Sequence, residues 1–378
     1  MKKFFFPGLL SLLIFSCSVS KRLPANDVPI NGLKYIGQYE VPLNMQFKGT
    51  TVGGLSGIDY DPKTDQYYLI CDDRSDINPA RFYTASIKIV SSGITNVQFL
   101  NVTTLLRKDG SPFPPSKKDK AHSADPEALR YDPKTNEMIW TSEGERIVKG
   151  DTALQDPSIT MMHTNGRYID TFPLPAQMHM NTFDIGLRKN STFEGLAFAD
   201  NFKTMYISVE EPLFQDGPHA SLQPADVFTR IIKYDMASHR PGAQYAYPLE
   251  PVAHPAKPEG EFMINGIPDI MSVGKNKLLV IERSFSTGIQ ACTIRVYLTD
   301  LSRASDISGL VSLIEQRFKQ PVEKKLLLNM DDLGIYIDNI EGVTFGPTLP
   351  NGHRTMIFVS DNNFDKKQKT QFLLFEVL

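Results

Sequence analysis

Short apolar runs alternate with polar turns along most of the chain, and no stretch after residue 30 shows a helical period. Five of these runs can be superposed on one another, and they are Gly53–Tyr60, Asp125–Tyr131, Thr192–Phe198, Ile267–Val273 and Asn339–Phe345. Apolar runs of this length between turn signals are typical of strands. We therefore expect a strand at the start of each of five repeated units.

Each first run is followed by a polar turn and then by a second apolar run that ends in an acidic residue. Two of the turns have the same sequence, Tyr-Asp-Pro-Lys-Thr, at Tyr60–Thr64 and Tyr131–Thr135. Proline fixes φ and aspartate accepts hydrogen bonds from its downstream backbone, as tight turns require. The second runs are Tyr67–Asp73, Met138–Glu143, Met205–Glu211, Leu278–Glu282 and Met356–Asp361. This order predicts a β-hairpin in each unit.

A third run follows in every unit, and a fourth is visible in most of them. Equivalent positions of the first runs lie 71, 67, 75 and 72 residues apart. Repeated units of four short strands predict an all-β fold, a single β-propeller with five blades. A degenerate sixth blade is an open alternative, and a pair of β-sandwich domains is the competing interpretation. Because the units are long, we expect the extra residues in loops such as Thr104–Ser123 and Glu211–Thr229.

The two ends of the chain fit the closure of a ring. The last unit stops at Leu378 after its third run, whereas Gly37–Leu43 resembles Ala243–Leu249, the fourth run of the third unit. An N-terminal strand that completes the last blade would remove the open edge of the sheet. We therefore predict that the propeller domain covers residues 31–378.

The first residues indicate export. Lys2 and Lys3 precede the apolar run Phe4–Phe15, which has the length of a signal-peptide core and is too short to span a membrane. Residues 1–16 are therefore predicted to be a signal peptide.

Ile14–Cys17 resembles a bacterial lipobox, which predicts lipidation of Cys17 and a lipid-anchored tether over residues 17–30. An ordinary cleaved signal with a chance cysteine is the alternative. We expect the protein in the cell envelope, on the periplasmic side of the outer membrane.

Charge and cysteine content narrow the possible partners. The net charge is −3 at pH 7, and it becomes −5 without residues 1–16, which hold two lysines and no acidic residue. Nucleic-acid binding needs a dense basic face and is therefore not expected. The cysteines and histidines show no zinc-ligand spacing. Cys71 and Cys292 are predicted to be buried free thiols, although an oxidising compartment would allow them to pair. We expect a monomer.

Acidic residues recur at two positions of the repeat. The first position, at the start of the first strand, holds Glu127, Glu194, Asp269 and Glu341, and the first unit has Ser56 there. The second position, at the end of the second strand, holds Asp72, Asp73, Glu143, Glu210, Glu211, Glu282 and Asp361. In the first three units the two positions are 16 residues apart. A hairpin brings them to the same rim, and the repeat gathers them around the propeller axis.

Carboxylates crowded in this way repel one another unless something neutralises them. Ca²⁺ takes six to eight oxygen ligands, so the second position predicts the metal ligands Asp72, Asp73, Glu143, Glu210, Glu282 and Asp361. The first position supplies the candidate catalytic residues Glu127, Glu194 and Glu341. Arg74 and Arg283 either neutralise the acids or bind an anionic group of the substrate. The competing interpretation is that the acids cap turns at the tops of the blades.

At these residues the chain resembles the esterase-like phytase family, a group of bacterial propellers. The matching segments are Gly54–Gly57, Asp72–Arg74, Asp125–Glu127, Phe193–Gly195, Glu282–Arg283 and Ile340–Gly342. The resemblance covers most of residues 50–362. It implies hydrolysis of phosphoric or other esters by analogy with calcium-dependent β-propeller phytases, in which Ca²⁺ bridges acidic side chains and substrate phosphates and activates water.

Three functions stay open at this point. The first is a metal-dependent hydrolase that takes a small anionic or ester substrate. The second is a non-catalytic propeller that binds a ligand, a glycan or an envelope protein. The third is a lactonase-type hydrolase in which one axial Ca²⁺ polarises a carbonyl group. A serine esterase is disfavoured, because Gly54–Gly57 opens a strand without the strand–turn–helix context of a nucleophile elbow.

Overall fold

The computed structural model describes Met1, residues 30–150 and residues 152–378. The predicted signal peptide, Cys17 and nearly all of the predicted tether lie outside the described residues. Within the described part, the elements are strands and three short 3-10 turns. None of its helices has the length and apolar character needed to cross a membrane.

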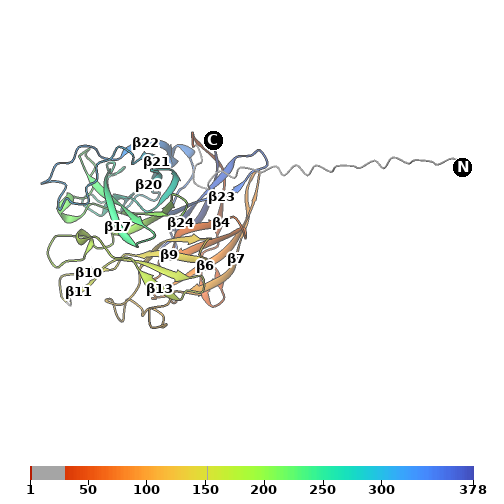
Figure 1. Ribbon diagram of the computed structural model, residues 1–378, viewed down its shortest axis with the longest axis horizontal. Helices are drawn as coiled ribbons and strands as arrows, with labels where there is room; N and C mark the ends of the chain where they lie inside the picture. Colours follow the sequence, from red (N-terminus) through yellow and green to blue (C-terminus); the bar gives the residue numbers. More distant parts are fainter. Residues whose placement is uncertain (2–29, 151) are drawn as a thin grey trace.

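Five antiparallel sheets form the blades of a propeller (Figure 1). Blade 1 consists of β4 (Leu55–Asp61), β5 (Gln66–Cys71), β6 (Arg81–Val90) and β7 (Gly93–Thr104). Blade 2 consists of β8 (Pro126–Asp132), β9 (Glu137–Ser142), β12 (Ser158–His163) and β13 (Tyr168–Thr171). Blade 3 consists of β14 (Phe193–Ala199), β15 (Thr204–Val209), β16 (Phe228–Asp235) and β17 (Arg240–Pro248).

Blades 4 and 5 depart from this simple order. Blade 4 consists of β18 (Met263–Gly266), β19 (Ile270–Gly274), β20 (Lys277–Ser286), β21 (Thr293–Asp300) and β22 (Glu323–Asn329). Blade 5 consists of β23 (Asn339–Thr348), β24 (Arg354–Asp361), β25 (Thr370–Val377) and the N-terminal β1 (Leu33–Val41). The innermost strands β4, β8, β14, β19 and β23 contact one another in a closed cycle. The prediction of five blades is therefore confirmed.

The ring closes as the matched ends of the sequence predicted. β1 pairs antiparallel with β25, from Leu33 opposite Val377 to Val41 opposite Thr370. Two backbone hydrogen bonds extend the pairing, because Asn31 donates to Leu378 and Leu378 donates to Gly32. The first strand of the chain thus completes the last blade, and this pairing closes the ring of blades.

The remaining elements are small and lie between the blade strands. Two short hairpins are formed by β2 (Gln46–Phe47) with β3 (Thr50–Thr51) and by β10 (Glu145–Ile147) with β11 (Ala153–Gln155). The 3-10 turns are η1 (Ala176–Met178), η2 (Phe214–Asp216) and η3 (Met330–Leu333). The expected long loops at 104–123 and 211–229 are present, and η2 lies in the second of them.

Apolar side chains fill the space between neighbouring blades. Alternate residues of one strand point to opposite sides of a sheet, and the middle strands are apolar on both sides. On β24, Phe358 packs in the core between blades 4 and 5, whereas Ile357 and Val359 pack in the core between blades 5 and 1. Each of the five blade-to-blade contacts contains a buried cluster of this kind. These cores hold the blades in fixed positions around the axis.

A break in strand pairing occurs at the first acidic position of four blades. The pairing register shifts between Leu55 and Gly57, Pro126 and Leu129, Phe193 and Gly195, and Ile340 and Gly342. Such bulges leave a residue out of the ladder and redirect its side chain. The residues at these bulges include Ser56, Glu127, Glu194 and Glu341.

The glycine that follows the acidic residue allows neighbouring innermost strands to pack closely against each other. A Cβ atom on Gly195 would lie 2.8 Å from the backbone nitrogen of Ile270 in blade 4. A Cβ atom on Gly342 would lie 3.0 Å from the backbone nitrogen of Ile58 in blade 1. The Glu-Gly motif of the sequence therefore combines an inward-facing acid with a close approach of the next blade.

A buried ion pair connects the innermost strands. Arg130 Nη2 of β8 donates to both carboxylate oxygens of Asp269, at 2.8 and 2.7 Å. The same guanidinium donates to the backbone carbonyls of Ile58, Ile270 and Val343. Asp269 also accepts a hydrogen bond from the Val343 backbone amide. The pair of Arg130 and Asp269 therefore joins four blades. Asp269 does not extend the acidic ring, although its place in the repeat predicted that it would.

We predict that this ion pair is a main determinant of stability. Asp269→Asn keeps the shape of the side chain but removes the carboxylate that is hydrogen-bonded to the buried Arg130, which should cost about 3–5 kcal/mol of unfolding free energy. Guanidinium unfolding followed by circular dichroism measures the change. Asp184→Asn is the matched control, because Asp184 pairs with Arg146 at 79% exposure and its loss should cost at most about 1 kcal/mol. Equal effects of the two substitutions would contradict the assignment.

Candidate functional site

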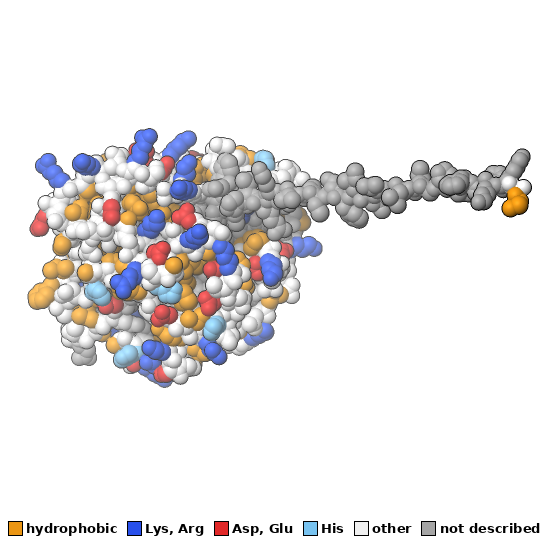
Figure 2. All heavy atoms as spheres, viewed as in Figure 1, with side chains coloured by type: hydrophobic (Ala, Val, Ile, Leu, Met, Phe, Trp, Pro, Cys, Tyr) orange, Lys and Arg blue, Asp and Glu red, His pale blue; other side chains and the backbone are white. Residues whose placement is uncertain are grey.

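One end of the propeller axis opens into a cavity of about 820 Å³ whose floor is acidic. We call its floor the axial carboxyl cluster, which consists of Asp72, Asp125, Glu127, Glu143, Glu194, Glu210 and Glu341. These side chains come from blades 1, 2, 3 and 5, and all but the half-buried Asp72 are buried. Elsewhere the charges are mixed, and Figure 2 shows acidic and basic side chains interspersed on one face. The predicted gathering of acids at one rim is thus present in these four blades.

The hairpin geometry of blades 2 and 3 brings these acids together. The backbone amide of Glu143, just after β9, donates to the carbonyl of Asp125, just before β8. The backbone amide of Glu210 donates in the same way to Thr192 of blade 3. Thr192 in turn donates its amide to Glu143 Oε1 at 2.8 Å, which joins the two blades.

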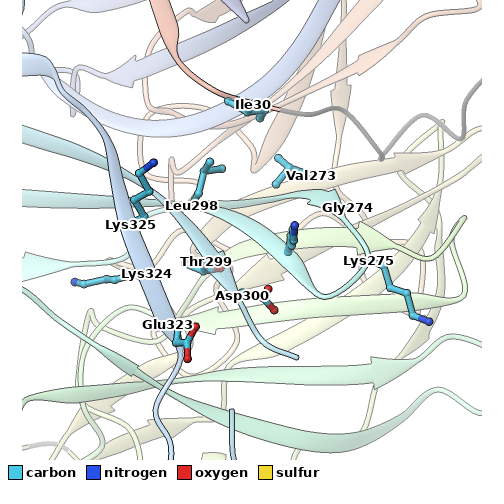
Figure 3. Close-up of a pocket in the computed structure, with 11 residues that line it drawn as sticks. Ile30, Val273, Gly274, Lys275, Leu298, Thr299, Asp300, Glu323, Lys324 and Lys325 are labelled. Carbon is cyan, nitrogen blue, oxygen red and sulfur yellow. The ribbon is translucent and has the colours of Figure 1, made fainter. Parts of the chain in front are cut away.

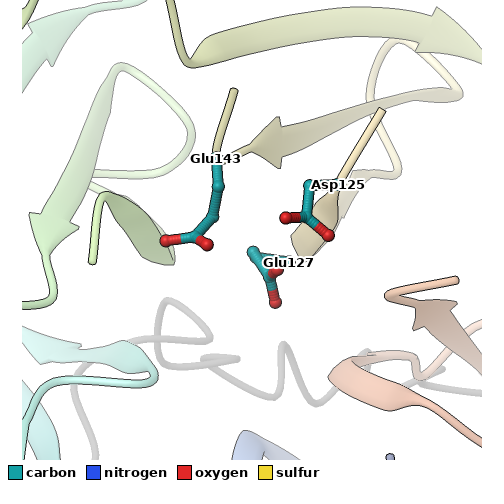
Figure 4. Close-up of side chains that lie close together, drawn as sticks. All are labelled: Asp125, Glu127 and Glu143. Carbon is teal, nitrogen blue, oxygen red and sulfur yellow. The ribbon is translucent and has the colours of Figure 1, made fainter. Parts of the chain in front are cut away.

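Two groups of three carboxyl groups are close enough to share a metal ion. Asp125, Glu127 and Glu143 form the first group, and their side chains converge in Figure 4. Glu143, Glu194 and Glu210 form the second. Within each group the ligand oxygens lie within 4.8 Å of one another, and every member is buried. Glu143 belongs to both groups and is therefore the central residue of the cluster.

Burial and mutual repulsion raise the pKa values of the cluster. Burial is the largest cause throughout, and it raises the pKa of Glu143 to about 8 with the help of Asp125 and Glu210. The pKa of Glu341 rises to about 8, that of Glu210 to about 7 and that of Asp125 to about 6. Those of Asp72, Glu127 and Glu194 rise well above the ordinary range. Without a cation the cluster therefore keeps its protons to higher pH than isolated carboxyl groups do.

Glu143 and Glu194 each place a carboxyl oxygen within 4.8 Å of the other. Two ionised carboxylates at this distance repel each other, and a proton on one of them relieves the repulsion. Burial, together with the neighbouring Glu143 and Glu210, raises the pKa of Glu194 well above its ordinary range. Glu194 therefore keeps its proton to a higher pH than an ordinary glutamate does.

Arg283 neutralises the side of the cluster that faces blades 3, 4 and 5. Its Nη1 donates to Glu341 Oε1 at 2.5 Å and to Asn339 Oδ1 at 2.6 Å. Its Nη2 donates to Glu210 Oε1 at 2.6 Å. Its buried Nε has no hydrogen-bond partner in the protein. Of the two roles left open for Arg283, the structure places it as a counter-charge within hydrogen-bonding distance of two cluster acids.

Arg74 lines the opposite side of the cavity. Its Nη2 donates to Glu145 Oε2 at 3.1 Å, and its Nε lies 3.5 Å from Asp125 Oδ2 without forming a hydrogen bond. Glu145 also pairs with Lys189 at 3.1 Å. Neither Asp125 nor Glu145 was predicted as a ligand from the sequence, although Asp125 stands two residues before Glu127. Asp125 was visible in the Asp-Pro-Glu motif, whereas no repeated position signals Glu145.

Two of the predicted metal ligands are saturated by other partners and do not line the cavity. Asp73 accepts hydrogen bonds from the amides of Asp76, Ile77 and Asn78, and it pairs with Arg81 at 2.8 Å. It is therefore a turn cap, as the competing interpretation held. Glu282 accepts hydrogen bonds from the side chains of Tyr247, Asn265 and Lys324 on the far side of β20.

Asp361 and Ser56 lie next to the cluster without lining the cavity. Asp361 accepts a hydrogen bond from the Asn363 amide, while its second oxygen is buried without a partner. Burial raises its pKa to about 6, and its charge acts on Asp72 and Glu341. Ser56 Oγ donates to the backbone carbonyls of Pro126 and Glu127. The Ser56 hydroxyl is therefore engaged by the backbone of blade 2.

The other features considered in the sequence carry no chemistry of this kind. Cys71 and Cys292 are buried and free, as predicted. A second cavity of about 650 Å³ lies on blade 4 beside Ile30, lined by Leu298 and several lysines (Figure 3). Its lining includes no member of the two groups of three close carboxyl side chains that are found among the described residues. The axial cavity is therefore the candidate functional site.

A comparison with protein families agrees with this geometry. The family model "Phytase-like: Esterase-like activity of phytase" matches residues 50–364. The matched range includes the whole axial carboxyl cluster and all four strands of blades 1 to 3. The chain therefore belongs to this phytase-like family, as the motifs around Asp72, Glu127 and Glu194 indicated.

Comparisons with individual proteins are less specific. No curated protein matches the sequence. An exo-β-1,3-galactanase from Phanerochaete chrysosporium has a TM-score of 0.46 and 11% identity over 90% of this chain and 64% of that one. An α-L-arabinofuranosidase from Lactobacillus brevis has a TM-score of 0.44 and 9% identity over 86% of this chain and 91% of that one. A periplasmic gluconolactonase from Pseudomonas aeruginosa has a TM-score of 0.35 and 8% identity over 87% of each chain. At these identities the likeness concerns the fold alone.

The raised pKa values predict an unusual pH dependence of the chelated protein. Glu143 has a native pKa of about 8 against an ordinary value of 4.5, so the native state binds more protons than the unfolded state between these limits. The stabilisation that this extra proton gives to the native state is complete below about pH 4.5, and it is lost as the pH rises through 8. In EDTA, the unfolding free energy should fall by about 1.4 kcal/mol per pH unit for each extra proton bound.

Glu143→Gln should flatten this profile and raise stability at pH 8, because glutamine carries no charge. Urea unfolding at pH 5, 6, 7 and 8 measures both effects. Glu40→Gln on β1 is the control, because Glu40 is 41% exposed and pairs only with Lys369 at the surface. Stability that stays constant or rises from pH 5 to 8 would contradict the electrostatic description of the cluster.

Proposed function

We propose that this phytase-like propeller is a metal-dependent hydrolase of phosphoric or other esters, with Ca²⁺ bound by the axial carboxyl cluster. The proposal rests on two groups, each of three neighbouring carboxyl side chains, that have Glu143 in common. Its donors are carboxylate oxygens without histidine or cysteine, which suits a hard cation. Three carboxylates offer up to six oxygens, and Ca²⁺ takes six to eight ligands.

The group of Asp125, Glu127 and Glu143 is the proposed ligand set. It lies on the side of the cluster away from Arg283, whose charge already neutralises Glu210 and Glu341. Glu143 is held by the Thr192 amide, so its carboxyl group has a fixed orientation. A bound Ca²⁺ supplies charge stabilisation for the ester oxygens and lowers the pKa of a bound water.

The other residues of the cavity perform proton transfer and substrate binding in this proposal. Glu194 holds a proton against Glu143 and donates it to the leaving oxygen of the ester. Arg74 binds an anionic oxygen of the substrate, because its Nε forms no hydrogen bond within the protein. Glu341, predicted as catalytic, positions Arg283 in this scheme, and Glu127 serves as a ligand.

Calcium binding should stabilise the protein in a pH-dependent manner. A ligand at 100 times its Kd adds about 2.7 kcal/mol to the unfolding free energy. We therefore expect millimolar Ca²⁺ to raise the melting temperature by several degrees at pH 8, and by less at pH 5, where protons compete for the carboxylates. Glu143→Gln should abolish the shift, whereas Glu40→Gln should retain it. A melting temperature that Ca²⁺ leaves unchanged at pH 8 would refute the metal site.

The role of Glu194 has a direct kinetic test. Glu194→Gln should lower kcat for an aryl phosphate or an aryl carboxylate ester by about 100-fold or more, because the amide donates no proton to a leaving group. The two substrates identify which ester class is used. Calcium-dependent stabilisation should persist, since Glu194 is outside the proposed ligand set.

Glu211→Gln is the control for this substitution. Glu211 is the sequence neighbour of Glu210 and is equally buried, but it binds Ser191 and His219 outside the cavity. Its substitution should leave kcat within about twofold, because it changes no group in the cavity. Full activity of the Glu194→Gln variant would show that the proton donor lies elsewhere.

A further inference from the structure

Blade 4 carries a strand for which the other blades have no equivalent. β18 pairs with the outer half of β20, from Met263 opposite Ser286 to Gly266 opposite Arg283. The innermost strand β19 pairs with the other half of β20. β20 therefore continues past Arg283, above the acidic floor, and β18 widens this extension into a wall of the cavity.

The wall changes from ionic to apolar with distance from the floor. Alternate residues of a strand share one face of the sheet, so Arg283 and Phe285 of β20 lie on the cavity side. Ile264 stands directly opposite Phe285 on β18, and Phe262 follows two residues further out. The Phe262 and Phe285 ring centroids are 6.2 Å apart. Phe262 is 62% exposed, although it lines the same cavity as the carboxyl cluster.

The apolar wall is fixed before any ligand arrives. The amide of Lys257 donates to Thr287, and the amide of Thr287 donates to Phe262. On the opposite face of β20, Ser284 Oγ accepts from the Ala253 amide. Gly288 has φ +77°, and a Cβ atom there would lie 2.2 Å from the Lys257 carbonyl oxygen. The preceding segment and the end of β20 are therefore closely packed together.

Apolar side chains gather on one side of the cavity. Its lining from blades 1 to 3 consists of Asp72, Arg74, Asp125, Glu127, Glu143, Asn190, Glu194 and Glu210, all polar or charged. Phe262, Ile264, Phe285 and Ile289 all belong to blade 4, and we call these four residues the blade 4 wall. A molecule in the cavity thus meets an acidic floor and, on one side, an apolar wall whose most exposed side chain is Phe262.

We infer that the blade 4 wall binds an apolar, aromatic or alkyl group of the substrate. This inference rests on the proposed function and names its substrate class as a monoester with an apolar group. A highly charged polyphosphate fits the cavity less well, because Arg283 is already paired with Glu210 and Glu341 and the floor is rich in carboxyl groups. Contact of an apolar group with the exposed Phe262 ring would remove apolar surface from water, which favours binding.

Two non-hydrolysable ligands with the same head group test the inference. Phenylphosphonate and methylphosphonate differ only in the apolar group, and their affinities for the calcium-loaded protein are measured by calorimetry. We expect phenylphosphonate to bind at least about 10-fold more tightly, which corresponds to about 1.4 kcal/mol. Phe262→Ser should reduce this preference to about threefold or less and leave the affinity for methylphosphonate unchanged.

Phe183→Ser is the matched control, because Phe183 is 73% exposed and does not line the cavity. It should retain the full preference for the phenyl compound. Equal affinities of the two phosphonates, binding of neither, or an unchanged preference in the Phe262→Ser variant would overturn the inference. A preserved preference in a protein that hydrolyses no aryl ester would instead refute the proposed hydrolase while leaving the apolar subsite in place.

Discussion

The repulsion between buried carboxyl groups is the constraint on which this site depends. Seven acids share one cavity floor, and they cannot all be ionised together without a compensating charge. Arg283 supplies that charge for Glu210 and Glu341. On the side of Asp125, Glu127 and Glu143, the one arginine at the cavity, Arg74, is shared with Glu145. Protonation relieves the remaining repulsion, and the proposed Ca²⁺ would relieve it as well, so the proposal links protonation, metal binding and stability.

The propeller scaffold holds this unfavourable arrangement in place. Five apolar cores lie between the blades, and Arg130 and Asp269 fasten four blades together below the floor. The bulges in the innermost strands turn Glu127, Glu194 and Glu341 towards the axis, and the glycines after two of them admit the neighbouring backbone. The same positions thus determine both the packing of the blades and the direction of the acids.

The repeat in the sequence was sufficient to predict the blades, their number and the closing strand, because each blade buries the same pattern of residues. It also predicted that acids from several blades meet at one rim. The repeat could not reveal partners from other elements, so Asp73, Glu282 and Asp269 were grouped with the rim although Arg81, Lys324 and Arg130 engage them. β18 was missed because its four residues have no counterpart in the other units.

Anomalous diffraction from crystals grown with Sr²⁺ or Tb³⁺ in place of Ca²⁺ tests the central claim most directly. Both ions favour oxygen ligands and scatter anomalously, so they mark a calcium site in the density. The expected result is a strong peak among the carboxylates of Asp125, Glu127 and Glu143, which disappears in crystals of the Glu143→Gln variant. A cavity floor without any peak, in crystals whose only peaks lie on the outer surface, would contradict the metal-binding role of the axial carboxyl cluster.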